Sequence, residues 1–219
     1  MTTLPTEKVI EQLVAQNSPV TPMGKPIENL LPWLLVSPVY VAVLIFMYHF
    51  RPDLAEKMYS YFFSLELILT SLLIITSIMT VAWLSYPDSY GLLWARWLPL
   101  LTLAMLVGLK FYEALFMPTA PLNLEHYSSM LGQADCAACI GLFAAVPGYM
   151  LYATCRKTST THYYWMGILA ALGVSAIGYL SLRLIEPTDN VQHLLVWHML
   201  PMLLFSVGGA WLGKRHFRW

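Results

Sequence analysis

Long apolar stretches alternate with short polar segments along most of the chain. The first begins near Leu30, and few charged side chains interrupt any of them. An α-helix needs about 20 apolar residues to cross the hydrocarbon core of a bilayer, and it satisfies its backbone hydrogen bonds internally. The pattern therefore predicts six transmembrane helices, near residues 30–49, 61–83, 95–116, 135–154, 164–184 and 191–213.

The composition agrees with a protein that is surrounded mainly by lipid. Of the 219 residues, 58% are hydrophobic and 11% are charged, whereas soluble domains carry about 25% charged residues. The formal net charge is zero, so there is no electrostatic reason to expect direct binding of nucleic acid. We expect an all-α, polytopic membrane protein whose residues 30–219 form a bundle of six transmembrane helices.

The distribution of Lys and Arg predicts the orientation of the bundle. If the N-terminus is cytoplasmic, eight of the twelve basic residues lie on the cytoplasmic side and four lie outside. Cytoplasmic loops of membrane proteins carry an excess of Lys and Arg. We therefore expect both termini in the cytoplasm and a multi-pass location in the bacterial inner membrane.

Residues 1–29 form a cytoplasmic arm in this topology. Residues 4–16 have the spacing of a short amphipathic helix, and residues 17–26 hold three prolines and a glycine, which predict an extended spacer. So short a helix is unstable alone, so its apolar face must pack on the membrane, on the bundle or on a cytoplasmic partner protein. The scarcity of basic residues argues against a membrane anchor. The apolar face consists of Val9, Ile10, Leu13 and Val14.

Ionisable residues gather at the helix ends opposite the arm. Such residues are costly within a membrane, and each suggests a function or a partner. Lys110 and Glu113 are three residues apart, and Asp189 and His193 are four apart, spacings that permit pairing on one helix face. Pairs of this kind can hold a bundle together or serve a function, and the sequence leaves both interpretations open.

The fourth predicted helix opens with Cys136-Ala-Ala-Cys139. Residues three apart on a helix face the same side, about 4.5 Å apart along the axis. The two sulfurs could form a disulfide or, with His193 or His198, bind a soft metal ion. Cysteine is also a common buried residue of apolar helices, so a structural role stays open. The candidate metal ligands are Cys136, Cys139 and His193.

Several motifs, in this order, resemble one family over essentially the whole chain. They are LVAQNSPVTPM at 13–23, FRPDL at 50–54, DCAACI at 135–140 and LRLIEPTDNVQHLLVWH at 182–198. The chain thereby resembles the NrsF family, negative regulators of sigma F. Members of this family are six-helix membrane anti-sigma factors that pair with extracytoplasmic-function (ECF) sigma factors.

The resemblance implies a regulator that is not an enzyme and needs no cofactor. The apolar face of the arm would bind a cytoplasmic ECF sigma factor and keep it from RNA polymerase. A periplasmic stress signal, such as a redox-active metal or an oxidant, would act on outward-facing cysteines and release the sigma factor. The candidate signal-sensing residues are Cys136, Cys139, Glu186, His193 and His198.

One position departs from the family pattern. Members often carry a second cysteine before the proline of the fifth-to-sixth loop, where this chain has Glu186. Either Cys139 replaces that cysteine, or the chain senses by ligation through Cys136, Cys139, His193 and acidic residues. Two other functions remain open. A membrane thiol oxidoreductase would normally need a second thiol pair, and a metal-handling membrane protein would need polar residues through the centre of the bilayer.

Overall fold

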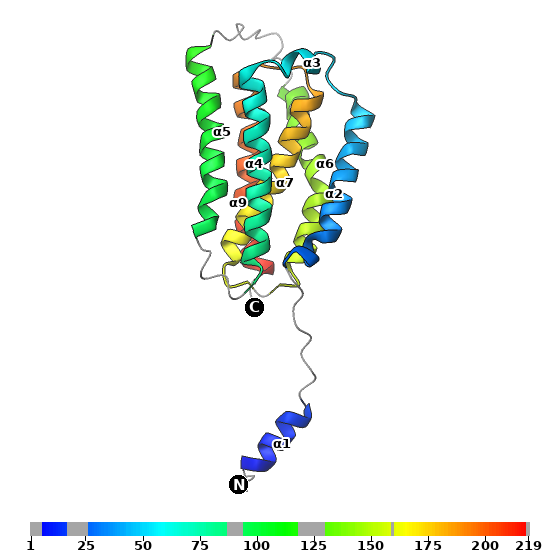
Figure 1. The fold of residues 1–219 in the computed structure, drawn as a ribbon, viewed down its shortest axis with the longest axis vertical. Coiled ribbons are helices and arrows are strands. Elements are labelled where there is room, and N and C mark those ends of the chain that lie inside the picture. The colour runs from blue at the N-terminus through cyan, green and yellow to red at the C-terminus, as the bar shows by residue number, and fades with distance from the viewer. Residues whose placement is uncertain (1–5, 17–25, 87–93, 118–129, 159, 218–219) are drawn as a thin grey trace.

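The computed structural model describes residues 6–16, 26–86, 94–117, 130–158 and 160–217, and within these ranges every long element is a helix. Six helical spans are long and apolar enough to cross a membrane, which confirms the predicted fold class. The spans stand side by side as a bundle, with one short helix apart from it (Figure 1).

The helix bounds agree closely with the predicted spans. The long helices are α2 (Pro26–Tyr48), α4 (Tyr61–Leu84), α5 (Trp97–Phe116), α6 (Met130–Cys155), α7 (Tyr163–Ile185) and α9 (Leu200–His216). The short elements are α1 (Thr6–Gln16), α3 (Leu54–Lys57), α8 (Val191–His193) and the π-helix η3 (Leu194–Met199). The sixth predicted helix is thus built from α8, η3 and α9, which form one continuous span.

Helix α7 forms the centre of the bundle. It packs against α4, α6 and α9, and 61% of its membrane-spanning window is buried, against 22% for α2 and for α5. Glycines allow α7 and α9 to approach closely, since Gly167 and Gly209 face each other with their backbones in contact. The outer helices expose apolar side chains such as Val39, Leu101 and Met105, as expected for surfaces that face lipid.

The arm helix α1 and the C-terminus lie at the same end of the bundle (Figure 1). Ile10, Leu13 and Val14 of α1 are more than half exposed. Val9 lies in α1, but its side chain is outside the described residues, as are residues 17–25 of the predicted spacer. The opposite end of the bundle is formed by α3, by α8 and by the chain that joins α7 to α8.

Candidate functional site

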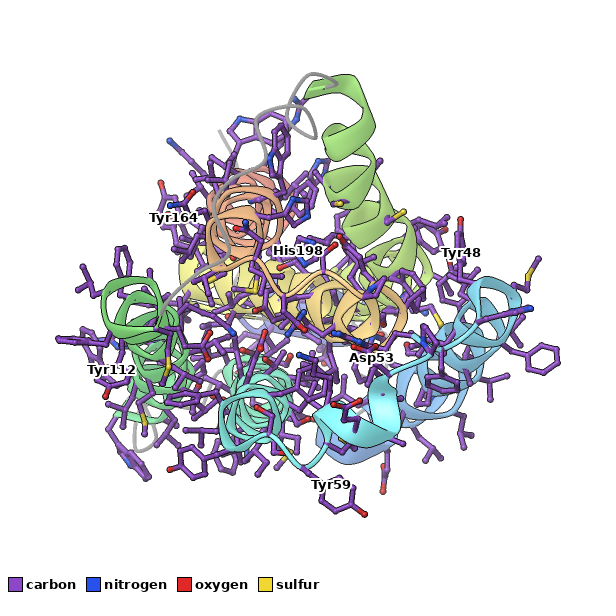
Figure 2. All side chains as sticks on the ribbon, turned by 90° about the horizontal axis from the view of Figure 1, so that it is seen from above. Tyr48, Asp53, Tyr59, Tyr112, Tyr164 and His198 are labelled. Atoms are coloured by element: carbon purple, nitrogen blue, oxygen red, sulfur yellow. The ribbon has the colours of Figure 1, made fainter. Side chains whose placement is uncertain are left out.

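Charged side chains concentrate at the end of the bundle opposite α1. Viewed from that end, Tyr48, Tyr59 and Tyr112 lie at the periphery, whereas His198 lies between the helices (Figure 2). Aromatic side chains of this kind are enriched where a membrane protein meets the lipid–water interface. The polar groups therefore lie inside the bundle near one membrane boundary.

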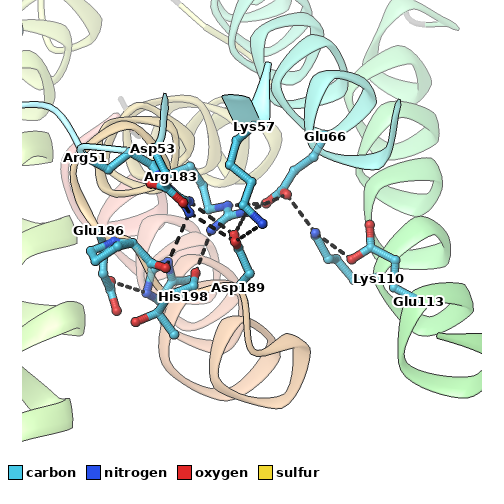
Figure 3. Close-up of polar contacts among 12 residues, drawn as sticks. Arg51, Asp53, Lys57, Glu66, Lys110, Glu113, Arg183, Glu186, Asp189 and His198 are labelled. Carbon is cyan, nitrogen blue, oxygen red and sulfur yellow. Dashed lines mark hydrogen bonds and ion pairs between the residues drawn. The ribbon is translucent and has the colours of Figure 1, made fainter. Parts of the chain in front are cut away.

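Glu66 of α4 joins three helices through one buried carboxylate (Figure 3). Lys110 Nζ from α5 donates to its Oε2 at 2.7 Å, and Arg183 Nε from α7 donates to its Oε1 at 2.8 Å. The hydroxyl of Tyr179, also on α7, donates to the same Oε1. Lys110 pairs in addition with Glu113 at 2.8 Å, which confirms the pair predicted from their spacing.

A second ionic layer lies above this buried carboxylate. Asp189 accepts from Arg51 at 3.0 Å, from Lys57 at 2.7 Å and from Arg183 at 3.1 Å. Arg51 also binds Asp53 through two hydrogen bonds of 2.7 Å each. Because Arg183 contacts both carboxylates, Glu66 and Asp189, it links the two layers into one network.

The predicted pair of Asp189 with His193 is wrong. Asp189 precedes the first residue of α8, Val191, so helical spacing does not apply to it. Its carboxylate turns instead towards the three cations of the second layer. His193 faces Glu186, with His193 Nε2 at 3.2 Å from Glu186 Oε1.

The second layer changes the titration of its members. Partial burial acts to raise the pKa of Asp189, but its hydrogen bonds with Arg51 and Lys57 and the charge of Arg183 outweigh burial and hold that pKa well below its ordinary value. The hydrogen bond to Asp53 raises the pKa of the Arg51 guanidinium, which therefore stays charged. Both residues are ionised at neutral pH.

We expect the stability that Asp189 contributes to depend on pH. Because its pKa is lower in the folded than in the unfolded chain, the contribution is complete above about pH 4 and disappears as the pH falls below that value. Thermal unfolding of detergent-purified wild type and Asp189→Asn, compared from pH 3 to pH 7, should show a difference that narrows at low pH. A difference that stays constant with pH would contradict this assignment.

Beside the ionic network, four potential ligand atoms, from α6, the C-terminus of α7, α8 and η3, lie within 4.8 Å of one another. We call these residues the outer cluster: Cys136, Glu186, His193 and His198. Cys136 Sγ is 3.5 Å from His193 Nε2 and 3.7 Å from Glu186 Oε2. Glu186 Oε2 in turn is 3.1 Å from His198 Nε2. The carboxylate therefore contacts the thiol and both imidazoles.

Local backbone structure brings the outer cluster together. Glu186 caps the C-terminus of α7, where its N–H donates to the Leu182 carbonyl at 2.8 Å. Asn190 caps α8 by accepting from the N–H of His193 at 3.1 Å. In an α-helix, residues five apart would point about 140° away from each other. The wider turn of the π-helix η3 reduces this offset, and the rings of His193 and His198 lie 5.2 Å apart between their centroids.

Glu186 is ionised within the outer cluster. Desolvation acts to raise its pKa, but the interactions with His193 and His198 outweigh desolvation and hold that pKa below its ordinary value. One carboxylate, one thiol and two imidazoles are donors that borderline divalent metal ions accept.

Of the five sequence-predicted sensing residues, four meet in the outer cluster, and Cys139 lies one turn further along α6, outside it. Glu186, the position that departs from the family pattern, is the residue beside Cys136. No pattern in the sequence links Glu66 to Arg183. Their separation of 117 residues leaves no local signal.

Comparison with known proteins gives one match. The family model described as "NrsF: Negative regulator of sigma F" matches residues 13–219, nearly the whole chain. The matched range includes all six membrane spans and the outer cluster, together with the last residues of α1. No curated protein and no solved structure matches the chain significantly.

Proposed function

Because the chain belongs to the NrsF family of negative regulators of sigma F, we propose that it is a membrane-embedded anti-sigma factor that holds an ECF sigma factor through its N-terminal arm. A negative regulator of a sigma factor has a sigma factor as its partner. The capture by the arm, the ECF class of the partner and the release by a periplasmic signal are parts of the proposal.

The exposed apolar face of α1 carries this proposal. The helix has 11 residues, too few to be stable in isolation, and it stands apart from the bundle (Figure 1). Ile10, Leu13 and Val14 are 54%, 60% and 69% exposed. An amphipathic helix with such a face typically binds in an apolar groove of a partner protein. Lys8 is its only basic residue, beside Glu7 and Glu11, which disfavours an anionic membrane surface as the alternative.

We place the arm in the cytoplasm and the outer cluster at the periplasmic face of the bacterial inner membrane. The excess of Lys and Arg at the end of the bundle that bears both termini supports this orientation. The arm would then meet the sigma factor in its own compartment, while Cys136, Glu186, His193 and His198 face the compartment from which stress arrives.

Contacts between α6 and α2 link the helix that bears Cys136 to the helix that follows the arm. Cys136 is on α6, and α6 packs against α2, the helix that follows the arm. Trp33 Nε1 donates to the Pro147 carbonyl at 2.8 Å, and the Tyr40 hydroxyl donates to the Leu142 carbonyl at 2.8 Å. A signal that shifts α6 would therefore act on α2. A tenfold change in sigma affinity requires about 1.4 kcal/mol of coupling between the two sites.

A thiol oxidoreductase is not favoured as an alternative. Such an enzyme would normally pass electrons between two thiol pairs, and the chain has three cysteines. The third, Cys155, is buried at the far end of α6 from Cys136.

Co-purification tests the arm as the binding element. The double substitution Ile10→Glu and Leu13→Glu should reduce capture of the co-expressed sigma factor at least tenfold, because central apolar contacts of an interface contribute about 2 kcal/mol or more each. Membrane insertion should not change, since α1 lies outside the bundle.

The matched control alters the polar face of the same helix. Glu7→Gln and Glu11→Gln should leave capture within about twofold of wild type, because rim charges contribute little. Full capture by the Ile10/Leu13 variant would show that another part of the chain binds the sigma factor.

A further inference from the structure

We propose that the outer cluster is a four-ligand site for a divalent transition-metal ion of the zinc class. Zinc is bound in proteins by cysteine sulfur, histidine nitrogen and carboxylate oxygen, and the cluster offers these three donor types. A thiolate and a carboxylate supply two negative charges, and two neutral imidazoles add none. A divalent ion would therefore leave the buried site electrically neutral, which avoids an uncompensated charge next to lipid.

The donor atoms already stand near tetrahedral separations. Metal–ligand bonds of about 2.0–2.3 Å in a tetrahedron place neighbouring donors roughly 3.3–3.8 Å apart. Cys136 Sγ lies 3.5 Å from His193 Nε2 and 3.7 Å from Glu186 Oε2. The Glu186 oxygens lie 3.2 Å and 3.1 Å from the two imidazole nitrogens. Because all four donors fall within 4.8 Å of one another, small side-chain rotations would bring them to the corners of a tetrahedron.

His198 provides an independent reason to expect a ligand. Its side chain is completely buried. Among the described residues Nδ1 has no hydrogen-bond partner, and Nε2 lies 3.1 Å from Glu186 Oε2 without the angle of a directed hydrogen bond. Buried polar groups are normally satisfied, and Nε2 points to the carboxylate side of the outer cluster, where a metal ion would bind it.

The backbone conformation of η3 also brings two of the proposed ligands together. The π-helix η3 is a rare element that occurs frequently at functional sites, and it turns His198 towards His193. The bound ion would connect the start of α6 to the end of α7 and to η3. The role of this metal site as the signal for sigma release rests on the proposed function. The binding of a metal ion to the site does not depend on that function.

Cobalt substitution tests the site directly. The purified full-length chain, titrated in detergent with Co²⁺, should bind one ion with the visible absorption of tetrahedral Co²⁺ and a near-ultraviolet thiolate-to-cobalt band. Cys136→Ser should abolish the thiolate band and weaken binding by more than about a hundredfold, because loss of a group that only supports a ligand already costs about 10- to 100-fold. Cys139→Ser is the matched control, one turn further along the same helix. It should leave the thiolate band and the affinity for Co²⁺ unchanged.

Three outcomes would overturn the metal site: no tetrahedral spectrum in the wild type, equal effects of the two serine variants, or binding that survives Glu186→Gln and Cys136→Ser together. Size-exclusion profiles and helical circular dichroism check that each variant is folded. If Cys136→Ser does not fold, Glu186→Gln provides a second variant that removes a ligand.

The signalling role has its own readout. Capture of the sigma factor by wild-type chain is compared with Zn²⁺ present and with chelator present. A difference of fivefold or more, absent in Cys136→Ser, supports release through this site. Unchanged capture by a chain that binds the ion overturns the signalling role and leaves the metal site standing. Loss of capture in the Ile10/Leu13 variant addresses the arm separately.

Discussion

Replacing Glu66 with leucine is expected to destabilise the bundle by about 3–5 kcal/mol, because removal of one member of a buried ion pair leaves the partner charges uncompensated. Glu66 is completely buried, and Lys110 and Arg183 are 2% and 3% exposed. Both cations direct hydrogen bonds at the Glu66 carboxylate. Lys110 would retain Glu113 and Arg183 would retain Asp189, but the contact among α4, α5 and α7 would lose its shared anion.

Unfolding of the detergent-purified protein by increasing denaturant measures this effect. Glu56→Leu is the control, because Glu56 is exposed on α3 and surface substitutions change stability by about 0.5 kcal/mol or less. Glu66→Gln separates charge from shape and should be destabilising by an intermediate amount. Replacing Lys110 and Arg183 by methionine in the Glu66→Leu variant should restore its stability, because the two buried cations that pair with Glu66 are then absent as well. Equal losses for Glu56→Leu and Glu66→Leu would exclude the network as a structural centre.

Replacing Gly209 with valine is expected to separate α7 from α9 and to cost about 3 kcal/mol or more. A Cβ at Gly209 would overlap the Gly167 carbonyl oxygen and the Ala171 side chain. The carbonyl belongs to the backbone of a helix and has no rotamer to relieve the overlap, so the two helices must move apart. In membranes, such close helix contacts between small residues provide much of the packing energy.

The neighbouring glycine is the matched control for this prediction. A Cβ at Gly208 meets nothing within 4 Å among the described residues, so Gly208→Val should change stability by about 0.5 kcal/mol or less. The two variants have the same composition and differ by one position on α9. Proteolysis or denaturant unfolding in detergent compares them, and similar behaviour would contradict the observed rotation of α9.

The membrane spans follow from the sequence because hydropathy and length are local properties. A run of about 20 apolar residues has to be helical in lipid whatever surrounds it, and the six predicted ranges agree with the observed spans. The amphipathic pattern of the arm likewise predicts a helix, and α1 occupies Thr6–Gln16. The i,i+3 pair of Lys110 with Glu113 was predictable because both residues lie within one regular helix.

The outer end of the bundle could be predicted only in part. All four residues of the outer cluster were predicted as candidates from the sequence. Cys139 was predicted with them, but it lies outside the cluster. Asp189 and His193 do not pair as their spacing predicts, because helix α8 begins between them at Val191. The π-helix that aligns His193 with His198 is a departure from the regular period that spacing arguments assume.

The sequence alone therefore determined how many helices cross the membrane, roughly where each begins and ends, and that a short amphipathic helix precedes them. Only the tertiary structure decided that Glu66 meets Lys110, 44 residues away, and Arg183, 117 residues away, and that Glu186 lies beside Cys136. The physical reason is that insertion into lipid depends on the composition of each segment. Pairing between segments depends on how each helix is rotated and placed against its neighbours, which is decided by packing across the whole bundle.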